Sequence, residues 1–299
     1  MSTQSTLPAL IAVCLSCFAL TASAAPPGAV RPRLKSGDSG DSVRILQLLV
    51  SETRSGNGPR IGSDGAFGPQ TKSALQAFQR AAKVDLSGEA TPRTWRALLR
   101  ASKRGLLGRI DPTSPVGAER YRLKTKGPKD VAIHLLPPIE VAPGRRAQPL
   151  LFLGKLAIDA DGDGDAWKSD PWGQAETSLQ WGGGRSLNPT KTPFFVLPIG
   201  FDKAYPGVKL GDLGAVIYRG KIAFAIFGDR GPGTKIGEGS IALAKELGIN
   251  ADPRTGGASE GVLWIVFPSS GNRRPLANDV IVRRGRELFA AAGGRLPRR

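Results

Sequence analysis

The spacing of apolar positions divides the chain into a helical first third and a strand-rich remainder. Before residue 110, apolar residues recur every three or four positions, the period of a helix with one buried face. This spacing predicts helices over 42–50, 69–82 and 92–99. Later in the chain, short apolar or alternating runs predict strands over 150–158, 193–199, 213–218, 221–227 and 262–267. We therefore expect an α+β protein, in which a small three-helix N-terminal bundle precedes a β-rich domain.

Turn and capping residues mark several boundaries between these elements. Arg219 and Gly220 separate two strands by two residues, the length of a tight hairpin turn. A short helix is expected after Ser240 and stops at Gly248, and a last helix is expected from Asn278 to Gly293. The segment 111–148 is rich in Pro, Gly and Lys, which favours a linker with one additional strand.

The first 24 residues have the pattern of an export signal. An apolar run over 7–20 is followed by small residues ending at Ala24, and cleavage there would remove both Cys14 and Cys17. No other apolar run reaches the ~20 residues that a membrane span needs. We therefore expect a secreted or cell-envelope-associated product that has no disulfide and is not held in the membrane after processing.

The positive charge is concentrated at the two ends of the mature chain. Residues 25–110 hold 15 Lys and Arg against 6 Asp and Glu, residues 111–271 hold 19 against 17, and residues 272–299 hold 8 against 2. Such an excess attracts anionic polymers. In an exported protein these are wall polymers, so nucleic acid is not expected as a partner. For the tail, solubility alone explains the excess equally well.

The N-terminal helices carry a long and specific pattern. It consists of GDSGDSVRILQLLV, DGAFGPQTKSALQAFQRAAKV and TPRTWRALL, and runs from Leu34 to about Leu99. This pattern resembles the peptidoglycan-binding repeat of wall hydrolases, from which it departs in an extended loop over 51–62. Its aromatic residues Phe67, Phe78 and Trp95 are expected in the core. The resemblance implies wall binding without assigning any contact residue.

The rest of the chain excludes most other chemistries. Its single imidazole, His134, lies in an alternating strand pattern typical of a structural residue, and no thiol remains after processing. Two carboxylates, Asp229 and Glu238, stand on a glycine-rich loop between a strand and a short helix. Glycoside hydrolysis is the main reaction that two carboxylates can perform alone, so no metal or other cofactor is expected.

Several pieces of the second domain occur in a distinctive order. They are KLAIDADGDG, the DP and TS of SDPWGQAETSL, LNPTKTPFFVLP, LGDLGAVIYRGKIAFAIFGDRGP, IGEGSIALAKELGI and WIVFP. In this order they resemble the chitosanases of glycoside hydrolase family 75. The resemblance implies endo-acting hydrolysis of β-1,4-linked glucosamine with inversion, with Asp229 and Glu238 as the essential carboxylates. It also implies a set of substrate-binding residues, namely Asp159, Asp161, Thr177, Ser178 and Tyr218.

The roles of the two carboxylates can be argued from their types and positions. An inverting enzyme needs one protonated carboxyl group and one carboxylate that activates water. The higher reference pKa of glutamate favours Glu238 as the acid and Asp229 as the base, although a place before a helix N-terminus stabilises the charged form of Glu238. In a purely structural interpretation, Glu238 instead caps the helix and Asp229 closes a turn beside Arg230.

The run IDADGDGDAWKSD has three interpretations. Clustered carboxylates at Asp159 and Asp161 would attract the ammonium groups of chitosan, which we favour. The spacing of Asp159, Asp161, Asp163 and Gly164, with Asp170 at the twelfth position, also resembles an EF-hand calcium loop, but it lacks the preceding helix and the final Glu. A solvated turn is the third. Trp167, Trp172 and Trp181 lie in the same loop-rich stretch and cannot be assigned to a subsite, whereas Trp264 is expected in the core.

A second, shorter resemblance provides an alternative function. The pieces GDRGP and GEGSIALAKELG are similar to part of the double-psi β-barrel proteins, some of which cut peptidoglycan strands. This makes such a barrel one expected form of the second domain, with Asp229 driving lytic cleavage of the glycan. Two non-enzymatic alternatives are a wall-binding protein that binds glycan without cutting it and a basic structural protein of the envelope.

The favoured interpretation is a secreted hydrolase that acts on chitosan or a related amino-sugar polymer and is targeted to the cell wall by binding peptidoglycan. Its expected segments are a signal peptide over 1–24, a peptidoglycan-binding helical domain over 25–110, a linker and entry segment over 111–148, a chitosanase-like catalytic domain over 149–277, and a basic C-terminal helix and tail over 278–299.

Overall fold

A computed structural model describes residues 31–53, 61–113, 117–127 and 129–296. The predicted signal peptide and most of the extended loop over 51–62 lie outside these residues. Within the described part of the chain, no helix has both the length and the apolar character needed to cross a membrane.

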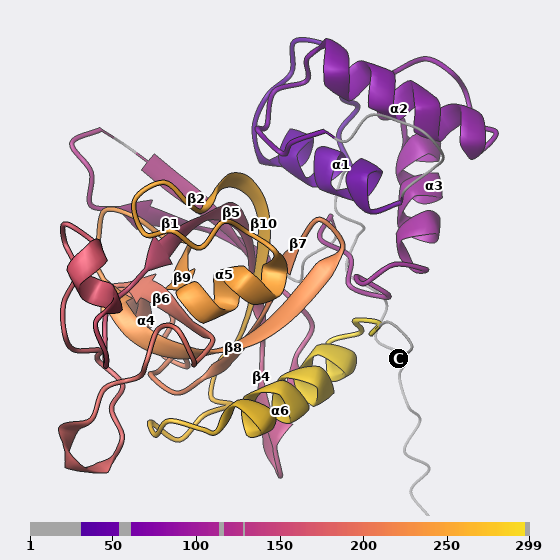
Figure 1. The fold of residues 1–299 in the computed structure, drawn as a ribbon. Helices are drawn as coiled ribbons and strands as arrows, with labels where there is room; N and C mark the ends of the chain where they lie inside the picture. Colours follow the sequence, from indigo (N-terminus) through magenta and orange to yellow (C-terminus); the bar gives the residue numbers. More distant parts are fainter. Residues whose placement is uncertain (1–30, 54–60, 114–116, 128, 297–299) are drawn as a thin grey trace, which may run out of the picture.

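Three helices form the N-terminal bundle, as the apolar spacing predicts (Figure 1): α1 (Asp41–Glu52), α2 (Pro69–Ala81) and α3 (Pro92–Ser102). The predicted aromatic core is confirmed, because Phe67, Phe78 and Trp95 are no more than 2% exposed. The side chain of Thr91 caps α3 by accepting a hydrogen bond from the backbone N–H of Thr94. Helix α1 instead starts after Gly40, where no side chain caps it.

The second domain is built on a closed six-stranded barrel. Its strands are β5 (Leu150–Asp159), β6 (Phe194–Pro198), β7 (Leu213–Tyr218), β8 (Lys221–Gly231), β9 (Glu238–Ser240) and β10 (Ala258–Phe267). They pair in the order β5-β10-β7-β8-β6-β9, and β9 pairs back onto β5 to close the barrel. The β7–β8 turn uses positive φ angles at Arg219 and Gly220, as expected for a two-residue hairpin. The α+β class and the barrel expectation are confirmed.

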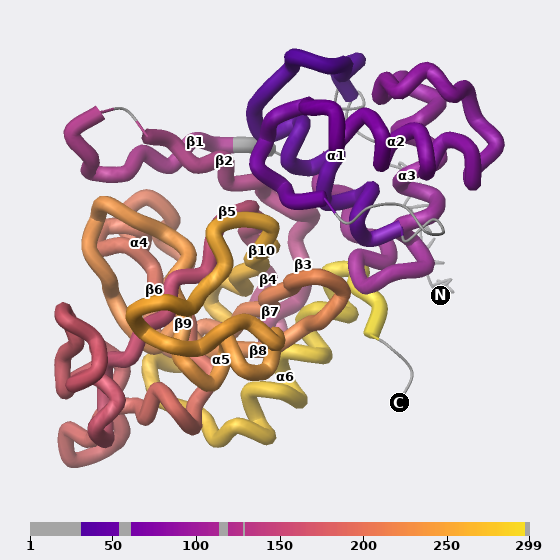
Figure 2. Tube along the Cα trace, turned by 45° about the horizontal axis from the view of Figure 1, so that its top comes forward, coloured from indigo at the N-terminus to yellow at the C-terminus, as the bar shows by residue number. Residues whose placement is uncertain are grey.

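The segment between the two domains has more regular structure than its composition predicts. It contains β1 (Gly117–Leu123), β2 (Lys129–Leu135), β3 (Ile139–Ala142) and β4 (Arg145–Ala147). Strands β1 and β2 form a hairpin that extends the barrel sheet through β5, whereas β3 and β4 pair only with each other. Figure 2 shows this hairpin reaching across the barrel toward α1. The sequence indicated only one strand here, the alternating pattern around His134 that lies in β2, because the Pro, Gly and Lys residues of the segment favour a linker.

Alternate residues of the barrel strands contribute to two cores. The inner set includes Phe152 and Trp264, whose rings stack at 5.9 Å. The outer set is covered by helix α6 (Asn278–Ala291), where Phe289 meets Phe224 edge to face at 6.2 Å, and it continues into the N-terminal bundle. After α6, the backbone N–H of Arg295 donates to the carbonyl of Leu106. The C-terminal segment thus ties the two domains together.

Candidate active site

The two candidate carboxylates lie on strands that flank β6. In the backbone register, Val196 of β6 is paired with Asp229 of β8 on one side and with Glu238 of β9 on the other. Paired residues point to the same face of a sheet. Asp229 and Glu238 therefore project to one face of the barrel, on either side of Val196.

This arrangement corrects the prediction that both residues stand on a loop. Strand β8 continues through Gly231, and β9 begins at Glu238, so only residues 232–237 connect them. A register shift in the β6–β8 pairing falls at Gly228, where a Cβ would come within 2.7 Å of the Phe194 side chain. The predicted strand stops too early because glycines, which usually mark turns, here allow close packing and a bulge.

The spacing of the strands sets the gap between the two carboxylates. Two steps between neighbouring strands separate the Cα atoms of Asp229 and Glu238 by about 10 Å. Inverting glycosidases hold their carboxyl groups ~6.5–9.5 Å apart to admit a water molecule. The backbone geometry is compatible with that gap.

Asp229 is buried and bound through one of its oxygens. Its Oδ1 accepts hydrogen bonds from the hydroxyl of Ser178 at 2.5 Å, from the Ser178 backbone N–H at 2.9 Å and from the Arg230 backbone N–H at 2.7 Å. All three bonds favour the ionised carboxylate. Burial has the larger effect and raises the pKa of Asp229. These bonds fix the carboxyl group and leave Oδ2 available to a ligand.

Glu238 has a different partner, the ammonium group of Lys235. Nζ of Lys235 lies 2.5 Å from Oε1 of Glu238, whose side chain is 8% exposed. Gly231 leaves room for the second oxygen, because a Cβ at that position would lie 2.8 Å from Oε2. Lys235 has no signal in the sequence beyond its place three residues before Glu238.

The capping role considered for Glu238 is wrong. The side chain of Ser240 accepts a hydrogen bond from the backbone N–H of Leu243 and caps α5 (Ile241–Leu247), the short helix predicted after Ser240. The helix ends at Gly248, which adopts the left-handed conformation. Glu238 therefore has no structural duty at the helix terminus.

Asp159 and Asp161 lie beside Asp229 at the end of β5. Burial raises the pKa of Asp159 well above its usual value, and the neighbouring Asp161 carboxylate raises it further. Burial also raises the pKa of Asp161 to about 6, against a hydrogen bond from the Gln174 backbone N–H at 2.7 Å. The cluster formed by Asp159, Asp161 and Asp229 therefore retains protons at a pH where an ordinary aspartate is ionised.

Among the described residues, this aspartate cluster is the group with the spacing of a cation site. One oxygen from each of Asp159, Asp161 and Asp229 lies within 4.8 Å of the others. Asp159 and Asp161 belong to the calcium-loop interpretation, whereas Asp229 does not, and Asp163 and Asp170 are not part of this cluster. Asp165 is exposed and pairs with Lys168 at 2.6 Å, and Asp170 accepts a bond from the backbone N–H of Trp172 at 3.0 Å.

The remaining predicted substrate-binding residues fall into different places. Ser178 contacts Asp229 directly. Thr177 is buried, and its hydroxyl donates to the Leu179 carbonyl at 2.8 Å, so it supports the loop that carries Ser178. Tyr218 is paired with Lys221 at the far end of β8, eight residues from Asp229, or ~26 Å along the strand. The structure therefore does not bring Tyr218 to the two carboxylates.

The aromatic residues also separate by location. Trp264 is 2% exposed, which confirms its predicted place in the core. Trp172 is 87% exposed on the loop that follows the aspartate run, next but one to Gln174, whose backbone contacts Asp161. An exposed ring in that place can stack on a sugar.

Comparison with known proteins agrees with the two-domain arrangement. Residues 156–286 match the model of the fungal chitosanases of glycosyl hydrolase group 75, and residues 39–98 match the model of a peptidoglycan-binding domain. The predicted order, a peptidoglycan-binding domain followed by a chitosanase-type domain, is confirmed.

Two curated proteins are similar to part of the chain. Zinc D-Ala-D-Ala carboxypeptidase of Streptomyces albus G is 44% identical over 62 residues, 21% of this chain and 24% of that protein. An uncharacterized protein in the bpoA1 3'region of Kitasatospora aureofaciens is 38% identical over 74 residues, 25% of this chain and 61% of that protein. The chain thus spans less than two thirds of the length of each relative.

Proposed function

We propose that this chain, in which a peptidoglycan-binding domain precedes a chitosanase-type domain, is an exported endo-acting glycoside hydrolase that cleaves β-1,4-linked glucosamine in a wall-associated polymer with inversion. The two family matches support a cell-wall-targeted glycoside hydrolase. The observation that carries the proposal is the register of Asp229 and Glu238 on opposite sides of Val196. This register supplies two carboxyl groups on one face at a spacing suited to a water molecule.

The electrostatic surroundings favour Asp229 as the general acid and Glu238 as the general base. Burial raises the pKa of Asp229, and two further aspartates within 4.8 Å keep protons in its neighbourhood. Glu238 forms an ion pair with Lys235 at 2.5 Å, and a general base acts in its carboxylate form. This assignment reverses the preference drawn from reference pKa values, because neighbouring charges outweigh the small intrinsic difference between Asp and Glu.

In the proposed reaction, the glycosidic bond breaks as a water molecule attacks from the opposite face of the sugar. Asp229 donates its proton to the leaving oxygen, and the C1–O bond breaks through an oxocarbenium-like transition state. Glu238 accepts a proton from the attacking water, whose oxygen becomes bonded to C1 with inverted configuration. Ser178 holds Asp229 in position through the bond to Oδ1.

Release of reducing ends from chitosan and from purified peptidoglycan tests the proposal. The comparison uses the wild type, Asp229→Asn, Glu238→Gln and a matched control, Asp163→Asn, which changes an exposed aspartate of the neighbouring loop. We expect each active-site variant to lose at least about a hundredfold in kcat and the control to keep wild-type activity. Retained hydrolysis in either active-site variant would refute the two-carboxylate mechanism.

A second measurement assigns the acid and the base. An aryl glycoside of a glucosamine oligomer has a leaving group that needs little protonation, so Asp229→Asn should regain activity on it while Glu238→Gln should not. Added azide can replace the attacking water, so it should rescue Glu238→Gln and yield a glycosyl azide of α configuration. The opposite pattern would restore the roles suggested by the reference pKa values.

The closed six-stranded barrel together with the peptidoglycan-binding domain favours one alternative, lytic cleavage of the peptidoglycan strand through a single acid, Asp229. Such a reaction forms a 1,6-anhydro end without adding water. Mass spectrometry of the products therefore separates it from hydrolysis. A lytic enzyme would also keep its activity in Glu238→Gln. Binding to both polymers without cleavage of either would instead indicate a wall-binding protein.

A further inference from the structure

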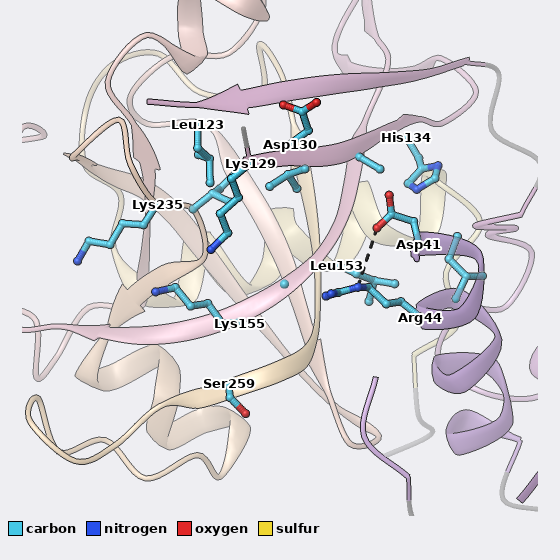
Figure 3. Close-up of a pocket in the computed structure, with 15 residues that line it drawn as sticks. Asp41, Arg44, Leu123, Lys129, Asp130, His134, Leu153, Lys155, Lys235 and Ser259 are labelled. Carbon is cyan, nitrogen blue, oxygen red and sulfur yellow. Dashed lines mark ion pairs between the residues drawn. The ribbon is translucent and has the colours of Figure 1, made fainter. Parts of the chain in front are cut away.

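A cavity of about 320 Å³ lies between the peptidoglycan-binding domain and the barrel. Helix α1 forms one wall through Asp41 and Arg44, and strands β2 and β5 form the opposite side. The loop before β9 closes the end nearest Glu238 by contributing Lys235. Figure 3 shows the residues that line this cavity, which both domains are needed to form.

Three lysine side chains line one end of this cavity. Figure 3 shows Lys129, Lys155 and Lys235 on the same side of it, apart from the Asp41–Arg44 pair, with the side chain of Lys235 directed away from the other two. Burial lowers the pKa of Lys155, and the positive charges of Lys235 and Lys129 lower it further, against the attraction of Glu238. We call Lys129, Lys155 and Lys235 the lysine cluster.

The acidic residues of the cavity do not neutralise the lysine cluster. Asp130 forms hydrogen bonds with Arg122 on the neighbouring strand, at 3.0 Å from its Nε. Asp41 is engaged with Arg44 at the other end of the cavity. Glu238 forms an ion pair with Lys235 and also attracts Lys155, but it supplies one negative charge against three lysines. The cluster therefore has excess positive charge in a partly enclosed space, where an anion would be attracted strongly.

The lysine cluster adjoins the candidate active site along strand β5. Ala157 is paired with Glu238, whereas Lys155 lies two residues to one side of it and Asp159 two residues to the other. Lys155 and Asp159 are thus ~13 Å apart along the strand. This face of the barrel therefore carries a positive charge at Lys155, on one side of Glu238, and an acidic group at Asp159, on the other side.

We propose that the lysine cluster binds a carboxylate carried by the substrate, so that the strand cleaved is peptidoglycan bearing free stem-peptide carboxylates and unacetylated glucosamine, rather than uniformly cationic chitosan. The proposal rests on the proposed hydrolase function. A sugar that bears an ammonium group would lie beside the cluster of Asp159, Asp161 and Asp229. An acidic substituent of the next sugar would then reach the cavity beside α1. Chitosan would place ammonium groups against the cluster, where like charges repel.

A binding measurement tests this proposal without any cleavage. In the Asp229→Asn background, soluble peptidoglycan fragments with free or amidated stem carboxylates are titrated by calorimetry. Lys129→Met/Lys155→Met removes two charges of the cluster but leaves Lys235, the partner of Glu238. Lys126→Met, on the exposed turn of the same hairpin, is the control.

We expect the double variant to bind the free-carboxylate fragment at least about tenfold more weakly, with a smaller salt dependence, and the control to bind normally. The amidated fragment should bind equally weakly to all forms, and chitosan oligomers should bind the double variant no less tightly. Equal affinity of the parent protein for free and amidated fragments would overturn the proposal. Tight binding of a uronic acid oligosaccharide would overturn the stem peptide as the source of the carboxylate.

Failure of this inference can be told apart from failure of the proposed function. If chitosan and peptidoglycan are hydrolysed but amidation changes nothing, the lysine cluster has no part in recognition and the hydrolase assignment stands. If neither polymer is cleaved while the free-carboxylate fragment binds through the cluster, the binding site stands and the catalytic proposal fails.

Discussion

Removal of the Ser178 hydroxyl tests the proposed acid directly, because it changes one hydrogen bond to Asp229 and no charge. In Ser178→Ala, Oδ1 of Asp229 loses the 2.5 Å bond from the hydroxyl but keeps the two backbone donors. A hydrogen bond to a charged group contributes ~1.5–3 kcal/mol, which corresponds to ~1–2 pKa units. Ser178 is exposed to solvent, so we expect the lower end, a rise of about one unit in the pKa of Asp229.

The direction of the effect on activity depends on which role Asp229 has. A general acid must be protonated, so a higher pKa moves the alkaline limb of the pH profile of kcat up by about one unit and leaves the acidic limb in place. A general base must be ionised, so the same change would move the acidic limb up instead. The assay is the pH dependence of kcat on a chitosan oligomer and on peptidoglycan fragments.

The matched control is Ser169→Ala, which removes an exposed hydroxyl bonded to the Ala166 carbonyl in the same region of the chain. It should leave both limbs unchanged. An unchanged alkaline limb in Ser178→Ala, or a shift of the acidic limb, would refute the assignment of Asp229 as the acid.

Three further perturbations test the site and the barrel. Gly231→Ala puts a carbon 2.8 Å from Oε2 of Glu238, so steady-state kinetics should reveal at least about a tenfold loss of kcat, with a melting temperature near that of the wild type. Burial raises the pKa of Asp212 from 3.8 to about 6. The protonated carboxyl group therefore contributes fully to stability below pH 3.8, and this contribution is lost as the pH rises past about 6. From about pH 4 to 8, urea unfolding should show the wild type losing up to ~3 kcal/mol relative to Asp212→Asn, and parallel curves would contradict this. Chelation with EDTA should leave hydrolysis unchanged, because carboxylates alone carry the reaction, whereas a loss restored by calcium would place a cation in the aspartate cluster.

Local patterns in the sequence were sufficient to predict most of the elements. Strand β7 has the predicted limits, and the Arg219–Gly220 turn and the end of α5 at Gly248 are confirmed because each depends on residues adjacent in the chain. Strands β8 and β10 are longer than predicted. Their extensions contain glycine, whose place in a strand is decided by the neighbouring strands and not by its own preference.

The candidate site was predictable in its residue types but not in its electrostatics. Both cysteines lie in the predicted signal peptide and the sequence has a single histidine, which leaves carboxylates, and this argument needs no structure. The ion pair of Glu238 joins it to Lys235, only three residues away, but the clustering of Asp229 with Asp159 and Asp161 depends on the closure of β9 onto β5, a contact between segments about 80 residues apart. No local pattern encodes such a contact, which is why reference pKa values suggested the opposite roles.

The closure of β9 onto β5 also explains why one face has both an acidic and a basic region. Because Ala157 is paired with Glu238, the alternation of β5 places Lys155 and Asp159 on the same face, on either side of the candidate base. A β5 that carried only acidic residues there would suit a polycation. This chain instead has lysines toward the peptidoglycan-binding domain, whose α1 completes the cavity around them. The domain fused to the barrel would then take part in choosing the substrate as well as in reaching the wall.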